Sequence, residues 1–126
     1  MNEEEIIKQI LDESFYIHKT IGPGMLENVY KTCLAYRLIK RGLFVETEKP
    51  IPVISKRSEW NAATGADLVI ERKVIVDTKS IEAIADIHIA RVLTYLRFLK
   101  LRHGLILNFR TVLFKMGSGE SLMVFK

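Results

Sequence analysis

Apolar residues recur along this chain at two spacings, which divide it into helical and strand-like stretches. Over residues 3–19, and again from Met25 to Arg41, they return every three or four positions, as on the buried face of an amphipathic helix. We expect the first helix to stop at Ile21-Gly22-Pro23-Gly24, because glycine and proline break helices, and Gly42 to end the second. The residues expected to face the core are Ile6, Ile7, Ile10, Leu11, Phe15, Ile17, Leu26, Val29, Tyr30, Cys33, Leu34 and Leu38.

Short runs of β-branched and aromatic residues predict strands in the rest of the chain. A third long helix, from about Ile84 to Arg102 with Gly104 closing it, interrupts them. The predicted order, ααββββαβββ, is that of a mixed α/β or α+β domain with one central sheet. The runs are Leu43–Glu48, Ile51–Ser55, a longer strand through Trp60 to Ile70 with a break or bulge near Gly65, Val74–Asp77, Leu105–Phe109, Val112–Met116 and Leu122–Phe125.

The composition is that of one globular domain, which we expect to span residues 1–126. With 126 residues, 48% hydrophobic and 27% charged, the chain can bury about two-thirds of the surface that its unfolded form exposes. A single cysteine excludes an intrachain disulfide and a thiolate zinc cluster, and it suggests a reducing compartment. The acidic start lacks the features of a secretory signal, and no apolar run approaches the ~18 residues of a membrane span. We therefore expect a soluble cytoplasmic protein.

The polar segment Glu71-Arg72-Lys73 separates two β-branched runs and predicts a hairpin with a three-residue turn. If Ile70 faces Val74 in this hairpin, the antiparallel register places Asp67 opposite Asp77, with Cβ atoms roughly 4.5–5.5 Å apart. Two facing carboxylates repel and raise one another's pKa unless a cation lies between them. Such oxygen ligands suit Mg²⁺ or Mn²⁺.

Lys79 follows Asp77 by two positions and therefore lies on the same face of the predicted strand. In a hydrolysis reaction, its ammonium group would hold the water molecule that attacks the substrate, or it would neutralise a phosphate. A two-residue turn would shift the register by one and place Thr78 opposite Asp67. A second alternative is an exposed ladder of charged residues without a metal.

Several stretches of the sequence resemble the blocks of a known family. Gly24-Met25-Leu26-Glu27-Asn28-Val29-Tyr30 resembles the GxxExxY signature of a family of small prokaryotic proteins. The resemblance runs from about Glu3 to Phe125, and its further blocks are residues 65–70 (GADLVI), residues 74–79 (VIVDTK), His88 and residues 104–109 (GLILNF). It implies membership of the PD-(D/E)XK nuclease-like superfamily, whose core is a mixed sheet flanked by helices.

The resemblance implies a role for each residue that matches the superfamily's motif. Glu27 would be the helical acid that helps to hold metal, often through water. Asp67 would be the metal ligand of the first strand, Asp77 the acid of the D-x-K element and Lys79 its lysine. Together with the backbone carbonyl of Thr78, these acids would hold one or two Mg²⁺ or Mn²⁺ ions.

His88, Arg91 and Tyr95 share one face of the predicted third helix, because they are spaced i, i+3 and i+7. In the RecB-like branch of the superfamily a Gln-x-x-x-Tyr element stands here, and this chain has Arg91 at the glutamine position and Tyr95 at the tyrosine position. Arginine cannot bind a metal. It would bind a substrate phosphate through two nitrogens, pair with a site carboxylate and block the metal, or simply lie on an exposed helix surface.

These residues support two function hypotheses. The first is a metal-dependent nuclease that cleaves DNA or RNA, with Arg91 and Tyr95 binding the substrate. The second is a catalytically inactive nuclease-like module for binding or assembly, which the arginine favours. The net charge of +4 would favour a polyanion only mildly. Because a 14.5 kDa core leaves little surface to grip a substrate, we expect a homodimer or a larger protein partner under either hypothesis.

Other reactive residue types are expected to pack rather than to react. His88 is expected to be a surface or hydrogen-bonded packing residue, and Cys33 a buried residue of an apolar helical face. Tyr30 lies one helical turn after Glu27 and is expected to pack against and orient that acid. Trp60 is expected at the core or the sheet edge.

Overall fold

The computed structural model describes residues 1–50, 65–110, 114–116 and 122–125. The order of elements in this part of the chain is ααβββαβββ, which confirms a mixed α+β fold. The strand predicted at Ile51–Ser55 and the position of Trp60 lie outside the described residues. The elements are α1 (Glu3–Ile21), α2 (Glu27–Lys40), β1 (Val45–Pro50), β2 (Gly65–Ile70), β3 (Val74–Lys79), α3 (Asp86–Leu99), β4 (His103–Asn108), β5 (Phe114–Met116) and β6 (Leu122–Phe125).

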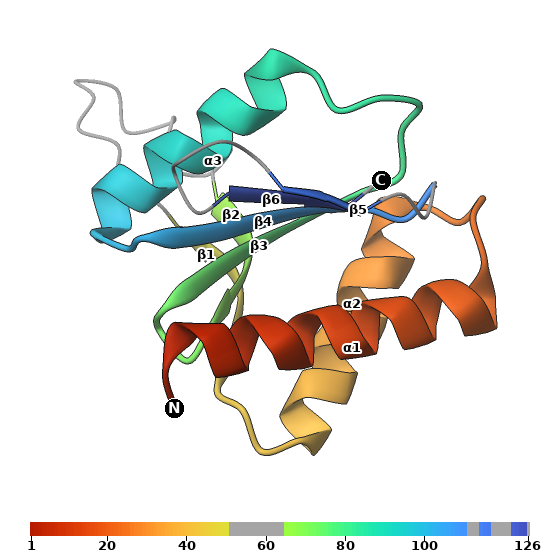
Figure 1. The fold of residues 1–126 in the computed structure, drawn as a ribbon, viewed down its shortest axis with the longest axis horizontal. Coiled ribbons are helices and arrows are strands. Elements are labelled where there is room, and N and C mark those ends of the chain that lie inside the picture. Colours follow the sequence, from red (N-terminus) through yellow and green to blue (C-terminus); the bar gives the residue numbers. More distant parts are fainter. Residues whose placement is uncertain (51–64, 111–113, 117–121, 126) are drawn as a thin grey trace.

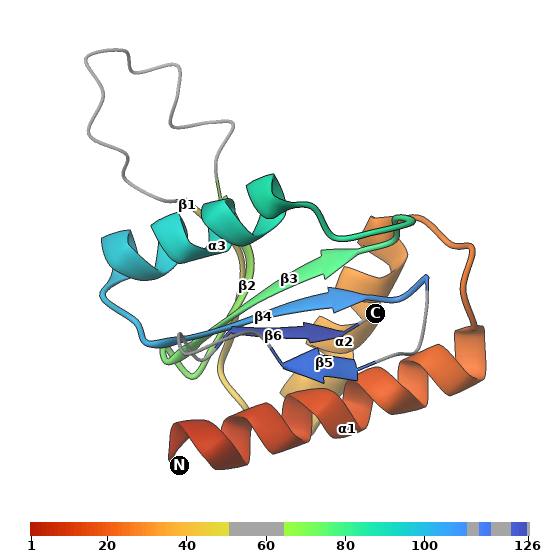
Figure 2. The same cartoon turned by 45° about the horizontal axis from the view of Figure 1, so that its top comes forward.

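One mixed six-stranded sheet, in the order β1-β2-β3-β4-β6-β5, forms the centre of the fold. Neighbouring strands are antiparallel at β1–β2, β2–β3 and β5–β6, and parallel at β3–β4 and β4–β6. Helix α3 connects β3 to β4 and covers one face of the sheet, while α1 and α2 cover the other (Figure 1). Figure 2 shows the N-terminal end of α2 beside the carboxyl end of β3, so a helix terminus and a strand end meet at one edge of the molecule.

Each face of the sheet has its own hydrophobic core. On the α1–α2 side, Ile6, Ile10 and Leu34 pack against strand residues such as Leu68 and Leu105. On the α3 side, the buried residues are Ala66, Val69, Ile75, Val92, Tyr95, Leu96 and Ile106. Because successive strand residues point to opposite faces, β2 and β3 contribute to both cores. The hairpin is therefore held from two sides.

Local capping explains where the helices begin and end. Asn2 caps α1, since its Oδ1 accepts the Glu5 N–H at 2.9 Å, and Gly22 ends the helix with a φ of +79°. Helix α3 ends earlier than predicted, at Leu99, because the next residue, Lys100, adopts the left-handed conformation with a φ of +57°. Gly104 is already part of β4, so it does not close the helix as expected. None of the described helices combines the length and hydropathy that crossing a membrane requires.

Two of the residues predicted to face the core are exposed. Leu26 is 79% exposed because it precedes the first residue of α2, so the helical periodicity does not apply to it. Phe15 is 44% exposed because the buried stripe of α1 continues through Glu13 and Ser14 instead. Cys33, predicted to be buried, is half-buried against the core.

Glu13 joins the two helices on its side of the sheet. Its carboxylate is buried and accepts hydrogen bonds of 2.5 Å from the Nε atoms of Arg37 and Arg41. Burial alone would raise the pKa of Glu13, but the two guanidinium groups outweigh it and leave that pKa below its ordinary value. These two ion pairs thereby join the middle of α1 to the C-terminal end of α2.

Candidate active site

The β2–β3 hairpin places Asp67 opposite Asp77, as predicted. Its turn is three residues long, and the pairing runs Ile70 with Val74, Val69 with Ile75 and Leu68 with Val76. The next pair in this register is Asp67 with Asp77. The alternative two-residue turn, with Thr78 opposite Asp67, is therefore wrong.

The backbone of β3 holds the Asp67 side chain. Oδ2 of Asp67 accepts the Thr78 N–H at 3.0 Å and lies 3.3 Å from the Thr78 hydroxyl oxygen. Thr78 itself is buried, while Asp67 is half-buried. The carboxylate of β2 is thus directed toward the strand that carries Asp77.

Asp77 is a buried acid with an unusual pKa of about 7. Burial raises the pKa most, a hydrogen bond to Asp67 and the Asp67 charge raise it further, and the Lys79 ammonium opposes them. Lys79 Nζ lies 3.3 Å from Asp77 Oδ2, and its side chain is only 13% exposed. Asp67, Asp77 and Lys79 therefore converge in one partly dehydrated cluster.

The first residues of α2 line a pocket next to this cluster. Glu27, the first residue of the helix, lines a pocket of about 130 Å³ together with Asn28, Lys31, Asp67 and Thr78. Glu27 itself is exposed. The structure thus brings Glu27 to the same pocket as Asp67. In the part of the chain that the structure describes, however, no three Asp, Glu, His or Cys side chains form a ready metal-binding group.

Tyr30 fixes the turn that leads into Glu27. Its hydroxyl donates to the Gly22 carbonyl at 2.5 Å and accepts the Met25 N–H at 3.1 Å, and its ring stacks on Phe109 with centroids 4.5 Å apart. Tyr30 was expected to pack against and orient the acid directly. It acts instead on the backbone before Glu27, from a fully buried position.

The family model of the PD-(D/E)XK nuclease superfamily matches residues 4–119. The chain belongs to this superfamily. No curated protein and no solved structure matches it. Members of the PD-(D/E)XK nuclease superfamily generally use divalent metals such as Mg²⁺.

The donor set fits such a metal. Oδ2 of Asp77 is buried, and although Lys79 Nζ lies 3.3 Å away, this oxygen accepts no well-formed hydrogen bond from the described residues. The like charge of Asp67 beside it is the kind of repulsion that a cation relieves. Hard divalent cations prefer carboxylate and carbonyl oxygens. Asp67, Asp77 and the carbonyl of Thr78 therefore suit the metals that PD-(D/E)XK nucleases use.

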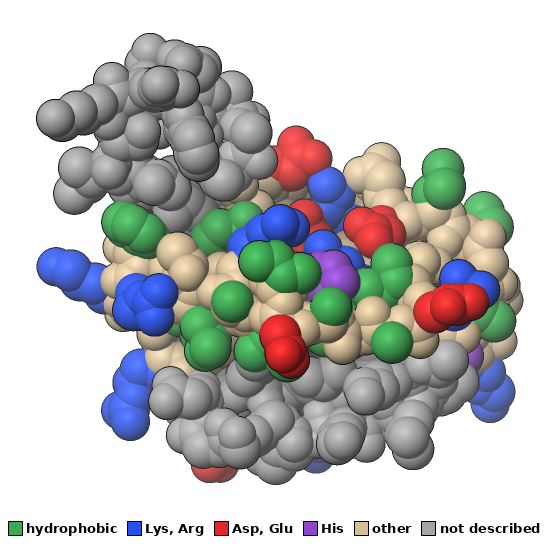
Figure 3. Space-filling model, turned by 90° about the horizontal axis from the view of Figure 1, so that it is seen from above, with side chains coloured by type: hydrophobic (Ala, Val, Ile, Leu, Met, Phe, Trp, Pro, Cys, Tyr) green, Lys and Arg blue, Asp and Glu red, His purple; other side chains and the backbone are tan. Residues whose placement is uncertain are grey.

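Arg91 and Tyr95 lie on the α3 side of the site. Tyr95 is buried, and its pKa is raised: burial contributes most, the Arg91 guanidinium lowers it, and the carboxylates of Asp77 and Asp67 raise it. Arg91 is exposed and forms no ion pair with any carboxylate of the described residues. Among the residues that the structure describes, the blocked arrangement, with Arg91 paired to a site carboxylate, is therefore not present. Figure 3 shows basic and acidic side chains beside a histidine on this face.

His88 has a structural task at the start of α3. Its Nδ1 accepts the Ala85 N–H at 2.9 Å, which caps the helix. This agrees with the hydrogen-bonded role expected for it. With Nδ1 occupied as an acceptor, the remaining ring nitrogen is the donor of the neutral side chain.

Sequence reasoning missed Lys31 and Glu48. Lys31 lines the pocket with Glu27, and its Nζ lies 2.7 Å from Glu48 Oε1. In the β1–β2 register, Glu48 lies between Thr47, which pairs with Leu68, and Lys49, which pairs with Ala66. The spacing of Lys31, one helical turn after Glu27, is a signal that could have found it. Glu48 has no such signal, because its place depends on the pairing of a distant strand.

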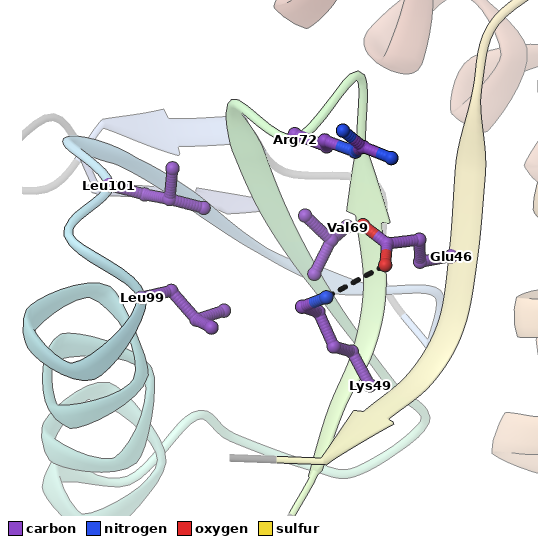
Figure 4. Close-up of a pocket in the computed structure, with 6 residues that line it drawn as sticks. All are labelled: Glu46, Lys49, Val69, Arg72, Leu99 and Leu101. Carbon is purple, nitrogen blue, oxygen red and sulfur yellow. Dashed lines mark hydrogen bonds and ion pairs between the residues drawn. The ribbon is translucent and has the colours of Figure 1, made fainter. Parts of the chain in front are cut away.

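A second pocket, of about 180 Å³, lies on the α3 side of the sheet, toward the hairpin turn (Figure 4). Glu46 and Lys49 of β1 form an ion pair of 2.7 Å there, opposite Leu99 at the end of α3 and Leu101 just after it. Its lining residues are Glu46, Lys49, Val69, Arg72, Leu99 and Leu101. None of them matches the PD-(D/E)XK motif, so this pocket is separate from the candidate active site.

Proposed function

We propose that this protein is a metal-dependent nuclease that hydrolyses phosphodiester bonds of DNA or RNA. The observation that carries the proposal is the facing pair of Asp67 and Asp77, with the Lys79 ammonium 3.3 Å from Asp77. Membership of the PD-(D/E)XK nuclease superfamily supports the same chemistry. The two opposed carboxylates repel each other, and a divalent cation bound between them would offset this repulsion.

Asp67, Asp77 and the carbonyl of Thr78 would hold Mg²⁺ or Mn²⁺, and Glu27 would contribute from the other wall of the pocket. A bound divalent ion supplies positive charge against the phosphate and lowers the pKa of a water molecule. Glu27 is exposed and begins a helix, so its side chain is free to turn toward the metal or toward water held there.

Lys79 would orient the attacking water and stabilise the negative charge that develops on the phosphate. Its side chain is held near Asp77 and is mostly shielded from solvent, which strengthens its electrostatic effect compared with an exposed lysine. Asp77 would in turn fix the position of this ammonium. Both residues come from one short strand, so their spacing is set by the backbone.

Arg91 and Tyr95 would bind the substrate from α3. Arg91 is exposed and unpaired among the described residues, and its planar guanidinium matches two phosphate oxygens. Tyr95 is buried beside the two carboxylates and would hold its hydroxyl toward them. This face would therefore position the nucleic-acid backbone against the acids.

We further propose that the chain is a GxxExxY protein and that residues 1–126 form a single nuclease-like domain, located in the cytoplasm. The three named positions of the signature have separate tasks here. Gly24 has a φ of +107°, a conformation that favours glycine, Glu27 lines the pocket, and Tyr30 fixes the turn between them. A homodimer or a larger protein partner would add surface for the substrate.

Cleavage assays test the proposed activity. The purified protein should cut at least one of single-stranded DNA, duplex DNA and RNA with Mg²⁺ or Mn²⁺, and a chelator should stop the reaction. Asp77→Asn and Lys79→Ala should abolish cleavage while the far-UV circular dichroism is unchanged, and Asp12→Asn, an exposed acid of α1, is the matched control. Cleavage by Asp77→Asn at the wild-type rate would falsify the assignment.

A second candidate function is an inactive binding or assembly module with the same fold. The arginine at the glutamine position of the third helix favours it, because arginine cannot act as a metal ligand. Calorimetric titration with Mn²⁺ separates the two functions. Heat of binding that Asp67→Ala removes supports the nuclease, whereas a wild-type protein that takes up no Mn²⁺ supports the module.

A further inference from the structure

Lys31 brings a second ammonium group to the wall of the candidate active site. It lies on α2 one turn after Glu27 and lines the same pocket as Asp67 and Thr78. Its side chain is only 15% exposed. A lysine shielded to this degree needs an anionic partner, because removing its charge from water is costly.

Glu48 is that partner in the present structure, and it is a weak one. Its carboxylate lies 2.7 Å from Lys31 Nζ, but the Glu48 side chain is 73% exposed. An ion pair with so exposed a partner adds little to stability and is easily exchanged. Glu48 also has a φ of +48°, a left-handed conformation that is strained for a residue with a side chain.

The position of this pair relative to the acids links it to the substrate. Glu48 lies between Thr47, which pairs with Leu68, and Lys49, which pairs with Ala66, so it is next to Asp67 on the neighbouring strand, and Asp67 in turn is next to Asp77 across the hairpin. Lys79 forms an ion pair with Asp77, and Lys31 forms one with Glu48, so an ammonium group lies on each side of Asp67. A phosphodiester chain that passes over these three acids would bring its phosphates to both ammonium groups.

We propose that Lys31 binds a backbone phosphate of the nucleic-acid substrate next to the one that is cleaved, and that Glu48 holds the Lys31 ammonium in place and competes with that phosphate. The proposal rests on the proposed function and adds a residue that contacts substrate. Exchange of one exposed carboxylate for a phosphate keeps the lysine paired throughout. In the absence of substrate, Glu48 thereby takes the place of the phosphate at Lys31, and this competition weakens the binding of the nucleic acid.

The opposite view is that the pair only braces α2 against β1. The two views give opposite signs for one substitution. If Glu48 competes with phosphate, Glu48→Gln removes a negative charge, releases Lys31 and tightens binding. If the pair is only a brace, Glu48→Gln and Lys31→Met both loosen the pocket, and both weaken binding or leave it unchanged.

The experiment measures binding in the non-cleaving Asp77→Asn protein by fluorescence anisotropy. The probes are short fluorescein-labelled oligonucleotides, as single-stranded DNA, duplex DNA and RNA, titrated in Mg²⁺ over a range of salt concentrations. Lys31→Met should weaken binding roughly tenfold, as expected for the loss of one charge-assisted contact. The slope of log K against log salt should fall by about 0.7 for single strands or 0.9 for duplex DNA.

Three further variants complete the test. Glu48→Gln should tighten binding several-fold, Lys31→Arg should restore most of the affinity, and Lys40→Met, which alters an exposed lysine at the other end of α2, should not reproduce the loss. Thermal unfolding of each variant shows that the pocket is folded. Weaker or unchanged binding by Glu48→Gln, or equal effects of Lys31→Met and Lys40→Met, overturns this inference alone. Absence of binding to every probe overturns the proposed function as well.

Discussion

Asp67 accepts the backbone N–H of Thr78, and this bond directs its carboxylate at Asp77 across the hairpin. The backbone of β3 thereby holds Asp67 of β2 beside Asp77 of β3. The raised pKa of Asp77, about 7, follows from burial and from this neighbour. The site is thus held in a repulsive arrangement by hydrogen bonding.

The stability of the metal-free protein should therefore fall as pH rises through about 7. The folded pKa of Asp77 lies above its unfolded value, so the folded state favours the protonated acid, and this contribution is complete below about pH 4. The difference between 3.8 and about 7 corresponds to about 4 kcal/mol. Asp77→Asn should gain most of this stability at pH 8 and little at pH 4 in urea unfolding with a chelator, whereas Asp12→Asn should show no such trend. A pH-independent difference would contradict the assignment.

Tyr30→Phe should loosen the turn before Glu27 while it keeps the stack on Phe109. It removes the hydroxyl that donates to Gly22 and accepts from Met25, which leaves two backbone groups without that partner. We expect a loss of about 1–3 kcal/mol in the free energy of unfolding. Cleavage should fall by more than the change in folded fraction, because Glu27 moves. A variant with normal stability and a normal rate would show that the hydroxyl has no positioning role.

Arg91→Gln should weaken substrate binding rather than release activity. The guanidinium is exposed and pairs with no carboxylate of the described residues, so there is no contact whose removal would open the metal site. We expect KM to rise roughly tenfold, as for the loss of one charge-assisted contact. Steady-state cleavage by the wild type, Arg91→Gln and Arg91→Lys measures the effect. A gain of activity in Arg91→Gln over an inert parent would show that the arginine blocks the site.

Gly104→Ala should destabilise the packing of α3 on β4. A Cβ at Gly104 would lie 2.8 Å from Cγ1 of Val92, closer than two carbon atoms can approach. Overpacking of this kind costs about 1–3 kcal/mol. The double variant Gly104→Ala with Val92→Ala should recover part of the loss, and a thermodynamic cycle from urea unfolding measures the coupling. Additive losses would mean that the strain lies elsewhere.

Much of the hairpin could be predicted because its determinants are local. Three polar residues between two β-branched runs specify the turn, and the turn specifies which acids face each other. The three helices were predicted for the same reason, although Lys100 ends α3 before Gly104. Glu27 was assigned by resemblance, and the structure brings it to the pocket that Asp67 lines.

What the sequence did not predict depends on distant parts of the chain. The partner of Lys31 lies on β1, and only the pairing of β1 with β2 brings Glu48 near Asp67. Tyr30 was expected near Glu27, but its contacts with Gly22 and Phe109 require the turn and β4 to be in place. Leu26 was assigned to the core because periodicity does not indicate the first residue of a helix.

The order of strands in the sheet differs from their order along the chain, and this matters during synthesis. β6 (residues 122–125) lies between β4 and β5, so β5 emerges from the ribosome before the strand that joins it to the sheet. Until then β4, with its apolar Leu105, Ile106 and Leu107, has an unpaired edge that another chain can occupy. A nascent chain that stalls after β5 is therefore a form exposed to aggregation, and this sheet is assembled only when β6 inserts between β4 and β5.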